Sequence, residues 1–210
     1  MAYGPDTRNR ILEVAFRLFH EQGYHATSVA TILREAGINS GSLYHFFPSK
    51  DALLEGVLQW ALGALRPEVM DHVERATADP LQRVIALLER YRMGMEMFGC
   101  RMGCPMGNLA LEVSDEYPRA RDLIHQNFEN WAGIVKGWLD AAGDRLPAHV
   151  DRAQLARFVL TVMEGGIMQS RAAGHLGPYD DTVAQFRAYL QALMREAELT
   201  RAQSGSGATA

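Results

Sequence analysis

The segment NSGSLYHFFPSK, residues 39–50, concentrates small hydrogen-bonding side chains on a stretch whose spacing predicts a short helix. Leu43, Phe46 and Phe47 recur on one side of that helix and would anchor it inward. The other side carries hydroxyl, amide and imidazole groups, which can bond to bases or phosphates. A helix that only fills a core does not need such a surface. The segment therefore favours a helix that binds another molecule.

The residues before this segment predict a second short helix and a tight turn. Val29, Ile32 and Leu33 follow the helical period, and a hydroxyl residue just before them can cap the helix. Gly37 supplies the left-handed backbone conformation that a β-carbon resists. Two short helices joined in this way predict a helix-turn-helix whose second helix lies in a DNA major groove.

The polar residues of this unit have predicted roles in DNA binding. Short side chains near the start of the second helix suit base edges or phosphates, and Gly41 lets the backbone approach the duplex. Tyr44 and Lys50 suit phosphates. Thr27 or Ser28 lies at the N-terminus of the helix that begins near Val29, where backbone N–H groups can bind an anion. The predicted DNA-binding set is Thr27, Ser28, Arg34, Asn39, Ser40, Gly41, Ser42, Leu43, Tyr44, His45 and Lys50.

Composition limits the class of protein. The chain has 210 residues, of which 48% are apolar and 22% charged, as in ordinary globular proteins. The net charge of −4 excludes a polycation, so a nucleic-acid site must be a local basic surface. No apolar run approaches the roughly 20 residues of a membrane span. The two cysteines, Cys100 and Cys104, fit a reducing cytoplasm and no disulfide framework.

The remaining sequence predicts helix after helix, so the expected fold class is all-α. Amphipathic periods recur to the end of the chain, and no alternating strand pattern interrupts them. We expect a DNA-binding domain at residues 1–50, a helical domain at residues 51–200 and a disordered tail at residues 201–210.

Residues 27–54, TSVATILREAGINSGSLYHFFPSKDALL, closely resemble the signature of the TetR family of bacterial transcriptional regulators. The upstream stretch RILEVAFRLFHEQGYHATS resembles the first helix of that family and its Gly-Tyr link. Leu33 departs from the family pattern, which usually has a small residue there. The resemblance implies a homeodomain-like, three-helix N-terminal domain, followed by a larger helical domain that binds an effector and dimerises.

The last two amphipathic helices match the dimer element that the resemblance implies, a bundle of four helices from two subunits. Gly165-Gly166 would allow close helix approach, either across that interface or beside a ligand pocket. The alternative is that both helices complete a monomeric core. The predicted interface residues are Phe158, Val162, Gly166, Phe186, Leu190 and Leu193.

A cluster of methionines around residues 93–106 suits a pocket for varied apolar ligands, although the same flexible side chains also fill gaps in a core. Residues 103–112, GCPMGNLALE, resemble a segment of one TetR subgroup, some members of which sense electrophiles or oxidants through a cysteine. Cys104 is therefore an alternative sensor, with Cys100 as a resolving thiol. The predicted effector-binding set is Met93, Met97, Cys104, Asn108, Glu112, Phe128, Trp131, Glu164 and Met168.

Two other classes of protein have less support in the sequence. An enzyme would use Cys104 as nucleophile with His125 or His175 as base, but no local catalytic signature surrounds them. A metal sensor would use Cys100, Cys104 and a histidine, but a lone C-x3-C is not a usual zinc spacing. We therefore predict no catalytic residue, no metal site and no cofactor.

The sequence thus predicts a cytoplasmic, homodimeric transcriptional repressor rather than an enzyme or a membrane protein. Its predicted partners are operator DNA with an inverted repeat and a small-molecule effector that releases the operator. Activation instead of repression stays open at this point, as do the operator sequence and the identity of the effector.

Overall fold

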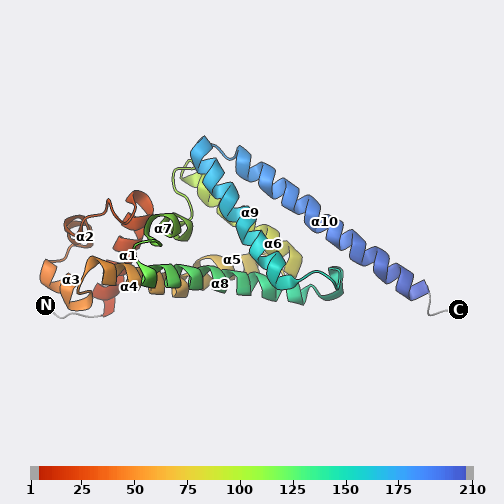
Figure 1. Ribbon diagram of the computed structural model, residues 1–210, viewed down its shortest axis with the longest axis horizontal. Coiled ribbons are helices and arrows are strands. Elements are labelled where there is room, and N and C mark those ends of the chain that lie inside the picture. Colours follow the sequence, from red (N-terminus) through yellow and green to blue (C-terminus); the bar gives the residue numbers. More distant parts are fainter. Residues whose placement is uncertain (1–4, 207–210) are drawn as a thin grey trace. The chain divides into compact units, whose positions relative to one another are not determined.

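A computed structural model describes residues 5–206, and within that range the chain is helical with no strand (Figure 1). The all-α prediction is confirmed. The elements are α1 Pro5–Gln22, α2 Val29–Ala36, α3 Ser40–Phe46, α4 Lys50–Leu65, a π-helical turn Arg66–Met70, α5 Asp71–Ala76, α6 Pro80–Met97, α7 Pro105–Val113, α8 Pro118–Ala141, a 3-10 turn Gly143–Arg145, α9 Arg152–Ala173 and α10 Gly177–Ser206. None of these helices is long and apolar enough to cross a membrane.

Local sequence signals set most of the helix ends. The side chains of Ser28, Ser49 and Asp79 accept backbone N–H groups at the starts of α2, α4 and α6, as N-caps do. Gly37 has φ 62° and closes α2 in the left-handed conformation. These bonds satisfy backbone groups at helix ends that have no partner within the helix, and each joins residues close together in the sequence.

Three local features were not predicted. A π-helical turn contains Pro67, whose missing N–H breaks the regular ladder after α4, and α5 follows it. Helix α7 begins at Pro105, whereas the sequence pattern indicated a short helix only from Asn108. The tail prediction is wrong for residues 201–206, where α10 continues as far as Ser206 and Arg201 lies 3.7 Å from Asp144. Residues 207–210 lie outside the described residues.

The chain divides into two compact units. The first contains the helices up to Pro67 together with Met102–Glu129, and the second contains Glu68–Arg101 and the described residues from Asn130 onward. The structure thus groups α4 and α7 with the N-terminal helices, whereas the boundary expected at residue 50 assigns them to the C-terminal domain.

A buried amide holds α4 in the first unit. The side chain of Asn127, on α8, is almost fully buried, and its Nδ2 donates to the backbone oxygens of Leu58 and Leu123. A buried polar group of this kind is stable only when it is bonded. Asn127 therefore fixes the first half of α8 against α4.

The second unit is organised around Tyr179, at the start of α10. Its hydroxyl donates to the Leu88 oxygen on α6 at 2.7 Å, and its backbone N–H donates to Ser170 Oγ on α9 at 2.9 Å. Burial raises the pKa of this phenol, and the nearby Glu164 and Asp180 add to that effect. Its ring packs on Gly166, where a β-carbon would lie 2.9 Å from Tyr179 Cδ2. One buried tyrosine thus joins three helices.

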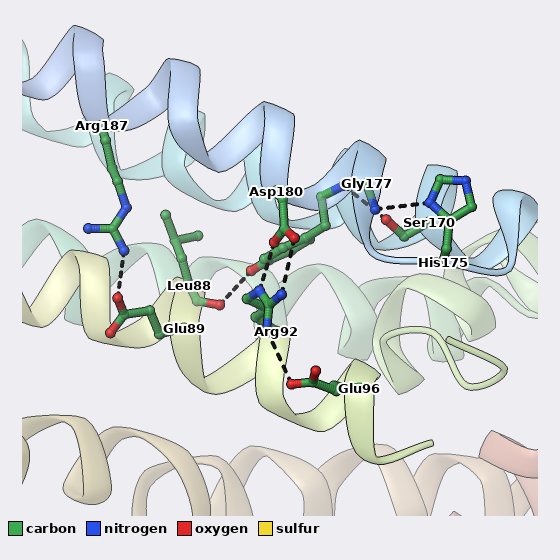
Figure 2. Close-up of polar contacts among 10 residues, drawn as sticks. Leu88, Glu89, Arg92, Glu96, Ser170, His175, Gly177, Asp180 and Arg187 are labelled. Atoms are coloured by element: carbon green, nitrogen blue, oxygen red, sulfur yellow. Dashed lines mark hydrogen bonds and ion pairs between the residues drawn. The ribbon is translucent and has the colours of Figure 1, made fainter. Parts of the chain in front are cut away.

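Ion pairs also join α6 to α10 in this unit (Figure 2). Arg92 on α6 donates from two nitrogens to the two carboxylate oxygens of Asp180 at 2.7 and 3.1 Å, and also to Glu96 at 3.2 Å. One helical turn away on α6, Glu89 accepts from Arg187 of α10 at 2.6 Å. Paired, fork-like geometry makes the Arg92–Asp180 contact the more specific of the two.

Replacement of Gly166 by Ala should lower the free energy of unfolding by about 1–3 kcal/mol, because the new methyl group collides with the buried Tyr179 ring. Urea unfolding measures the change. Gly137→Ala on α8 is the matched control, since a β-carbon there meets nothing within 4 Å. Alanine has a higher helix propensity than glycine, so Gly137→Ala should raise the free energy of unfolding by up to about 1 kcal/mol. Equal behaviour of the two variants would contradict close packing at Gly166.

Replacement of Asp79 by Asn should lower the free energy of unfolding by about 1 kcal/mol at pH 7, because the amide keeps a capping oxygen but loses its charge opposite Arg145. The Arg145 guanidinium holds the pKa of Asp79 below its ordinary value. The stabilisation is therefore present above the unfolded pKa of about 3.9 and is lost as the pH falls through the lower folded pKa. Urea titrations at neutral and strongly acid pH should show the difference between the proteins shrinking at acid pH.

Candidate nucleic-acid interface

The pair α2–α3 forms a helix-turn-helix with a side-chain cap on each helix. Ser28 Oγ accepts from the Thr31 N–H at 3.0 Å, and Asn39 Oδ1 accepts from the N–H and the hydroxyl of Ser42 at 2.8 and 3.1 Å. The predicted left-handed turn at Gly37 lies between the two helices. The caps matter because helices of eight and seven residues are marginal by themselves.

The anchors of α3 face the core of the first unit. Leu43 is 2% exposed, Phe47 is also buried, and Phe46 is half-buried. Arg8, on α1, lies with its guanidinium 5.4 Å from the centre of the Phe47 ring. The opposite face of α3 carries the exposed residues Ser40, Gly41, Tyr44 and His45. Tyr44 is 49% exposed although it is a large aromatic residue.

Three of the predicted DNA contacts are buried, and their roles are corrected. Thr27 is inaccessible, and its hydroxyl donates to the backbone oxygens of Gly23 at 2.6 Å and Leu18 at 3.3 Å. Leu43 is an anchor only. Ser42 is nearly buried, and its hydroxyl donates to the Asn39 cap. These side chains shape the unit from inside and present little surface to a duplex.

Lys50 is also placed differently from the prediction. Its Nζ donates to the Tyr24 oxygen at 2.6 Å and lies 4.2 Å from the centre of the Tyr24 ring. Partial burial lowers the pKa of this ammonium, while Glu112 and Asp51 act in the opposite direction. Lys50 is therefore engaged inside the unit, which argues against its assignment as a phosphate contact.

Two exposed arginines provide positive charge on or next to the helix-turn-helix, Arg34 on α2 and Arg8 on α1. Arg34, which the sequence assigned to DNA binding, is exposed on α2, with its Nη2 3.4 Å from Glu35. Arg8 was missed, because its proximity to α3 depends on the packing of α1 and leaves no trace in local spacing. Its guanidinium, held over the Phe47 ring, lies at the end of the recognition helix.

The predicted effector residues are divided between the two units. Cys104, Asn108, Glu112 and Phe128 belong to the first unit, and the others belong to the second. In the second unit Trp131 is buried and Glu164 is half-buried. Met93, Met97 and Met168 are exposed, Met97 to 76%, so these methionines do not line a closed core.

Glu112 takes a role that the sequence did not suggest. Its Oε2 accepts from the Tyr24 N–H at 2.9 Å, and its Oε1 accepts from the His25 N–H at 2.8 Å. Both oxygens are thus engaged by the turn between α1 and α2. The assignment of Glu112 as a hook for an effector is revised accordingly. No local signal could have found this contact, because the partners are 87 and 88 residues apart.

The cysteines are buried and are not part of a metal cluster in the described chain. Cys100 and Cys104 are both almost inaccessible. Within residues 5–206 no group of three or more His, Cys, Asp and Glu residues is arranged to hold a metal ion. Cys100 has a left-handed backbone with φ 57°, unusual for a residue with a β-carbon.

Most of the predicted dimer residues face the inside of their own subunit. Val162, Gly166, Phe186, Leu190 and Leu193 are buried where α9 and α10 pack on each other and on α6. This corrects their assignment to a surface between subunits. Phe158 alone of the predicted set is exposed, to 45%.

The comparisons with known proteins cover both units. Residues 11–57 match the family described as "Bacterial regulatory proteins, tetR family", and residues 80–186 match "Tetracyclin repressor-like, C-terminal domain". The chain is similar to the HTH-type transcriptional regulator LmrA of Bacillus subtilis, with 33% identity over 180 residues that cover 85% of this chain and 93% of that protein.

Two further proteins are similar. The HTH-type transcriptional repressor KstR2 of Mycobacterium tuberculosis is 44% identical over 84 residues, 38% of this chain and 40% of that protein. A TetR transcriptional regulator from Chloroflexus aurantiacus has a solved structure with a TM-score of 0.78 and 25% identity, covering 91% of this chain and 97% of that one. Sequence motif, fold and relatives agree, and the chain belongs to the TetR family of helix-turn-helix transcriptional regulators.

Proposed function

We propose that the protein is a homodimeric repressor that binds an inverted-repeat operator in the cytoplasm and is released from it by a small-molecule effector. The observation that carries this proposal is the exposed face of α3, formed by Ser40, Gly41, Tyr44 and His45. Repression is supported by KstR2, a relative that is named a repressor. The relatives are named as regulators rather than enzymes, and we propose no catalytic activity.

The face of α3 suits the reading of base edges. A recognition helix places its N-terminal residues at the floor of the major groove. Here those residues are small, so the helix backbone can lie deep in the groove, and the larger Tyr44 and His45 project from the next turn. The Ser40 hydroxyl and the His45 imidazole can bond several base edges, while the Tyr44 hydroxyl can bond a phosphate.

Arginines replace Lys50 as the proposed phosphate contacts. Arg34 is exposed on α2, and Arg8 is held over Phe47 at the end of α3. Guanidinium groups bind phosphate through two parallel hydrogen bonds, which fixes orientation as well as adding affinity. Their separation on two helices would define how the unit sits on the backbone of the duplex.

The outer face of α9 and α10 is the proposed dimer surface. The exposed residues Phe158, Thr161 and Met168 and the half-buried Gly165 recur along α9 at helical spacing, and Tyr189 of α10 lies beside Phe158. The rings of Phe158 and Tyr189 are perpendicular, with centres 5.8 Å apart. A β-carbon at Gly165 would meet nothing within 4 Å, so a helix of a second subunit could approach closely there.

An effector would act by population shift, stabilising a dimer whose recognition helices no longer match successive major grooves. The alternative trigger is reaction of Cys104 with an electrophile or oxidant. The burial of Cys104 disfavours it, because a thiol reacts readily only where solvent and reagent reach the sulfur. We therefore propose reversible capture of a ligand as the signal.

Replacement of Arg8 by Gln should weaken binding to all DNA sequences and reduce the slope of log affinity against log salt by about one unit, because one phosphate contact is lost. Fluorescence anisotropy across a salt series measures this on an operator duplex selected from random-sequence DNA by the wild-type protein. His45→Ala should leave the slope unchanged but alter base preference by about 1–3 kcal/mol at one position.

Arg195→Gln controls for the loss of one positive charge, since Arg195 is exposed on α10, in the second unit. This control should retain the wild-type slope. An Arg8→Gln protein with wild-type affinity and slope would contradict the proposed docking of α1 and α3. Failure of the wild-type protein to select any duplex would contradict the function itself.

Replacement of Tyr189 by Glu should release folded monomers and abolish tight operator binding, because a charge is placed on the proposed subunit interface. Tyr189 is 44% exposed, so the fold of the subunit should tolerate the change. Light scattering and circular dichroism measure mass and folding. Leu190→Glu should instead unfold the subunit, since Leu190 is buried. A folded dimeric Tyr189→Glu protein would show that the interface lies elsewhere.

A further inference from the structure

The segment from Gly103 to Glu112 is tied at one end to α1 and at the other to the turn between α1 and α2. At one end His20 Nε2 lies 2.7 Å from the Gly103 oxygen and donates to it, because a carbonyl only accepts. At the other end the Glu112 carboxylate accepts from the Tyr24 and His25 N–H groups. All of these residues belong to the first unit, where α7 packs beside α1 (Figure 1).

Gly23 allows the carboxylate to approach the turn. Its φ of 86° is a conformation that favours glycine, and a β-carbon there would lie 3.0 Å from both oxygens of Glu112. Two successive N–H groups then point at one carboxylate, each oxygen accepting one bond. We call this arrangement, one Glu112 carboxylate accepting from the Tyr24 and His25 N–H groups, the fork. Hydrogen bonds to an ionised acceptor are about twice as strong as neutral ones, so the fork is a strong local restraint.

The peptide groups of Tyr24 are restrained from both sides. Glu112 accepts its N–H, while Lys50 Nζ donates to its C=O at 2.6 Å. The Tyr24 hydroxyl donates to Asp51 at 2.6 Å, and the ring stacks edge-on against Tyr117 with centres 5.3 Å apart. Burial, followed by the bond to Asp51, raises the pKa of this phenol, so the hydroxyl stays a donor.

The restrained turn sets where α2 begins. The Thr27 N–H donates to the Tyr24 oxygen at 3.2 Å, and the Thr27 hydroxyl donates to the Gly23 oxygen. Ser28 follows immediately as the N-cap of α2. Since α2 and α3 are too short to be stable alone, their orientation depends on how the chain enters them.

We propose that Glu112 is a positioning residue for operator binding, which holds the α1–α2 turn and thereby fixes the orientation of the recognition helix. This inference rests on the proposed function. Glu112 touches no DNA and acts through the backbone of Tyr24 and His25. A displacement of the last turn of α7 would break the fork and release the entry to α2, so α7 controls the DNA-binding geometry from outside the helix-turn-helix.

Two substitutions test the fork in different ways. Glu112→Gln keeps the length of the side chain but offers one acceptor oxygen to two N–H donors. Glu112→Asp keeps the charge but is one methylene shorter. Glu116→Gln is the charge-matched control, because Glu116 lies close to Glu112 in the chain, is largely exposed and approaches only the His25 ring, at 4.0 Å.

Amide hydrogen exchange and operator affinity should change together. In both Glu112 variants the Tyr24 and His25 amide hydrogens should exchange about tenfold faster than in the wild type. Both variants should also bind the selected operator duplex about tenfold more weakly. Glu116→Gln should match the wild type in both measurements. Affinity is measured well below the midpoint of thermal unfolding, so a loss of stability alone does not alter it. If one variant unfolds, the other still gives both readouts.

Unchanged exchange at Tyr24 and His25 in the folded variants would overturn the fork. Faster exchange with wild-type operator affinity would overturn the positioning role and leave only a structural contact. If the wild-type protein selects no duplex, the proposed function fails, while the exchange measurement still reports on the fork. The positioning role is supported only when both the exchange rate and the operator affinity change in the Glu112 variants and neither changes in Glu116→Gln.

Discussion

The short length of the recognition helix is the constraint on which the DNA-binding face depends. Seven residues form fewer than two full turns of hydrogen bonds, too few to offset the entropy of ordering the chain. The helix exists because Asn39 caps it, Leu43 and Phe47 anchor it, and Gly37 sets its angle to α2. Each support comes from the inward side or from an end. The outward side of α3 does not stabilise the helix, so its residues are available for binding another molecule.

The two glycines in α9 show how adjacent residues serve different faces of a helix. Gly166 faces inward and lets the Tyr179 ring approach, while Gly165 faces open space. A rotation of about 100° per residue separates the two faces, so one helix can pack within its subunit and still present a smooth surface. The buried face is determined by packing with Tyr179. The open face is the part of α9 that association between subunits would use.

Sequence patterns predicted the contacts between residues that are close in the sequence and missed the contacts between residues that are distant in it. The cap at Ser28 and the turn at Gly37 are bonded within four residues, so the pattern contains the whole interaction. Lys50 and Glu112 meet the Tyr24 backbone across 26 and 88 residues, and nothing in their spacing reveals this. The dimer set failed for another reason. Large apolar residues lie on the outer face of α9 and α10 (Phe158, Met168 and Tyr189) as well as on the buried face, so periodicity could not distinguish the two faces.

The position of Cys104 links thiol chemistry to the same contacts that hold the recognition helices. Cys104 is buried at the N-cap position of α7, next to Gly103, whose oxygen accepts from His20. A reagent reaches a buried sulfur only through local opening. Opening at this point loosens the end of α7 that is tied to α1, and the other end of α7 holds the turn before α2 through Glu112. Exposure of the thiol and release of the recognition helices would therefore be two consequences of one local opening, because both depend on how firmly α7 is held against α1.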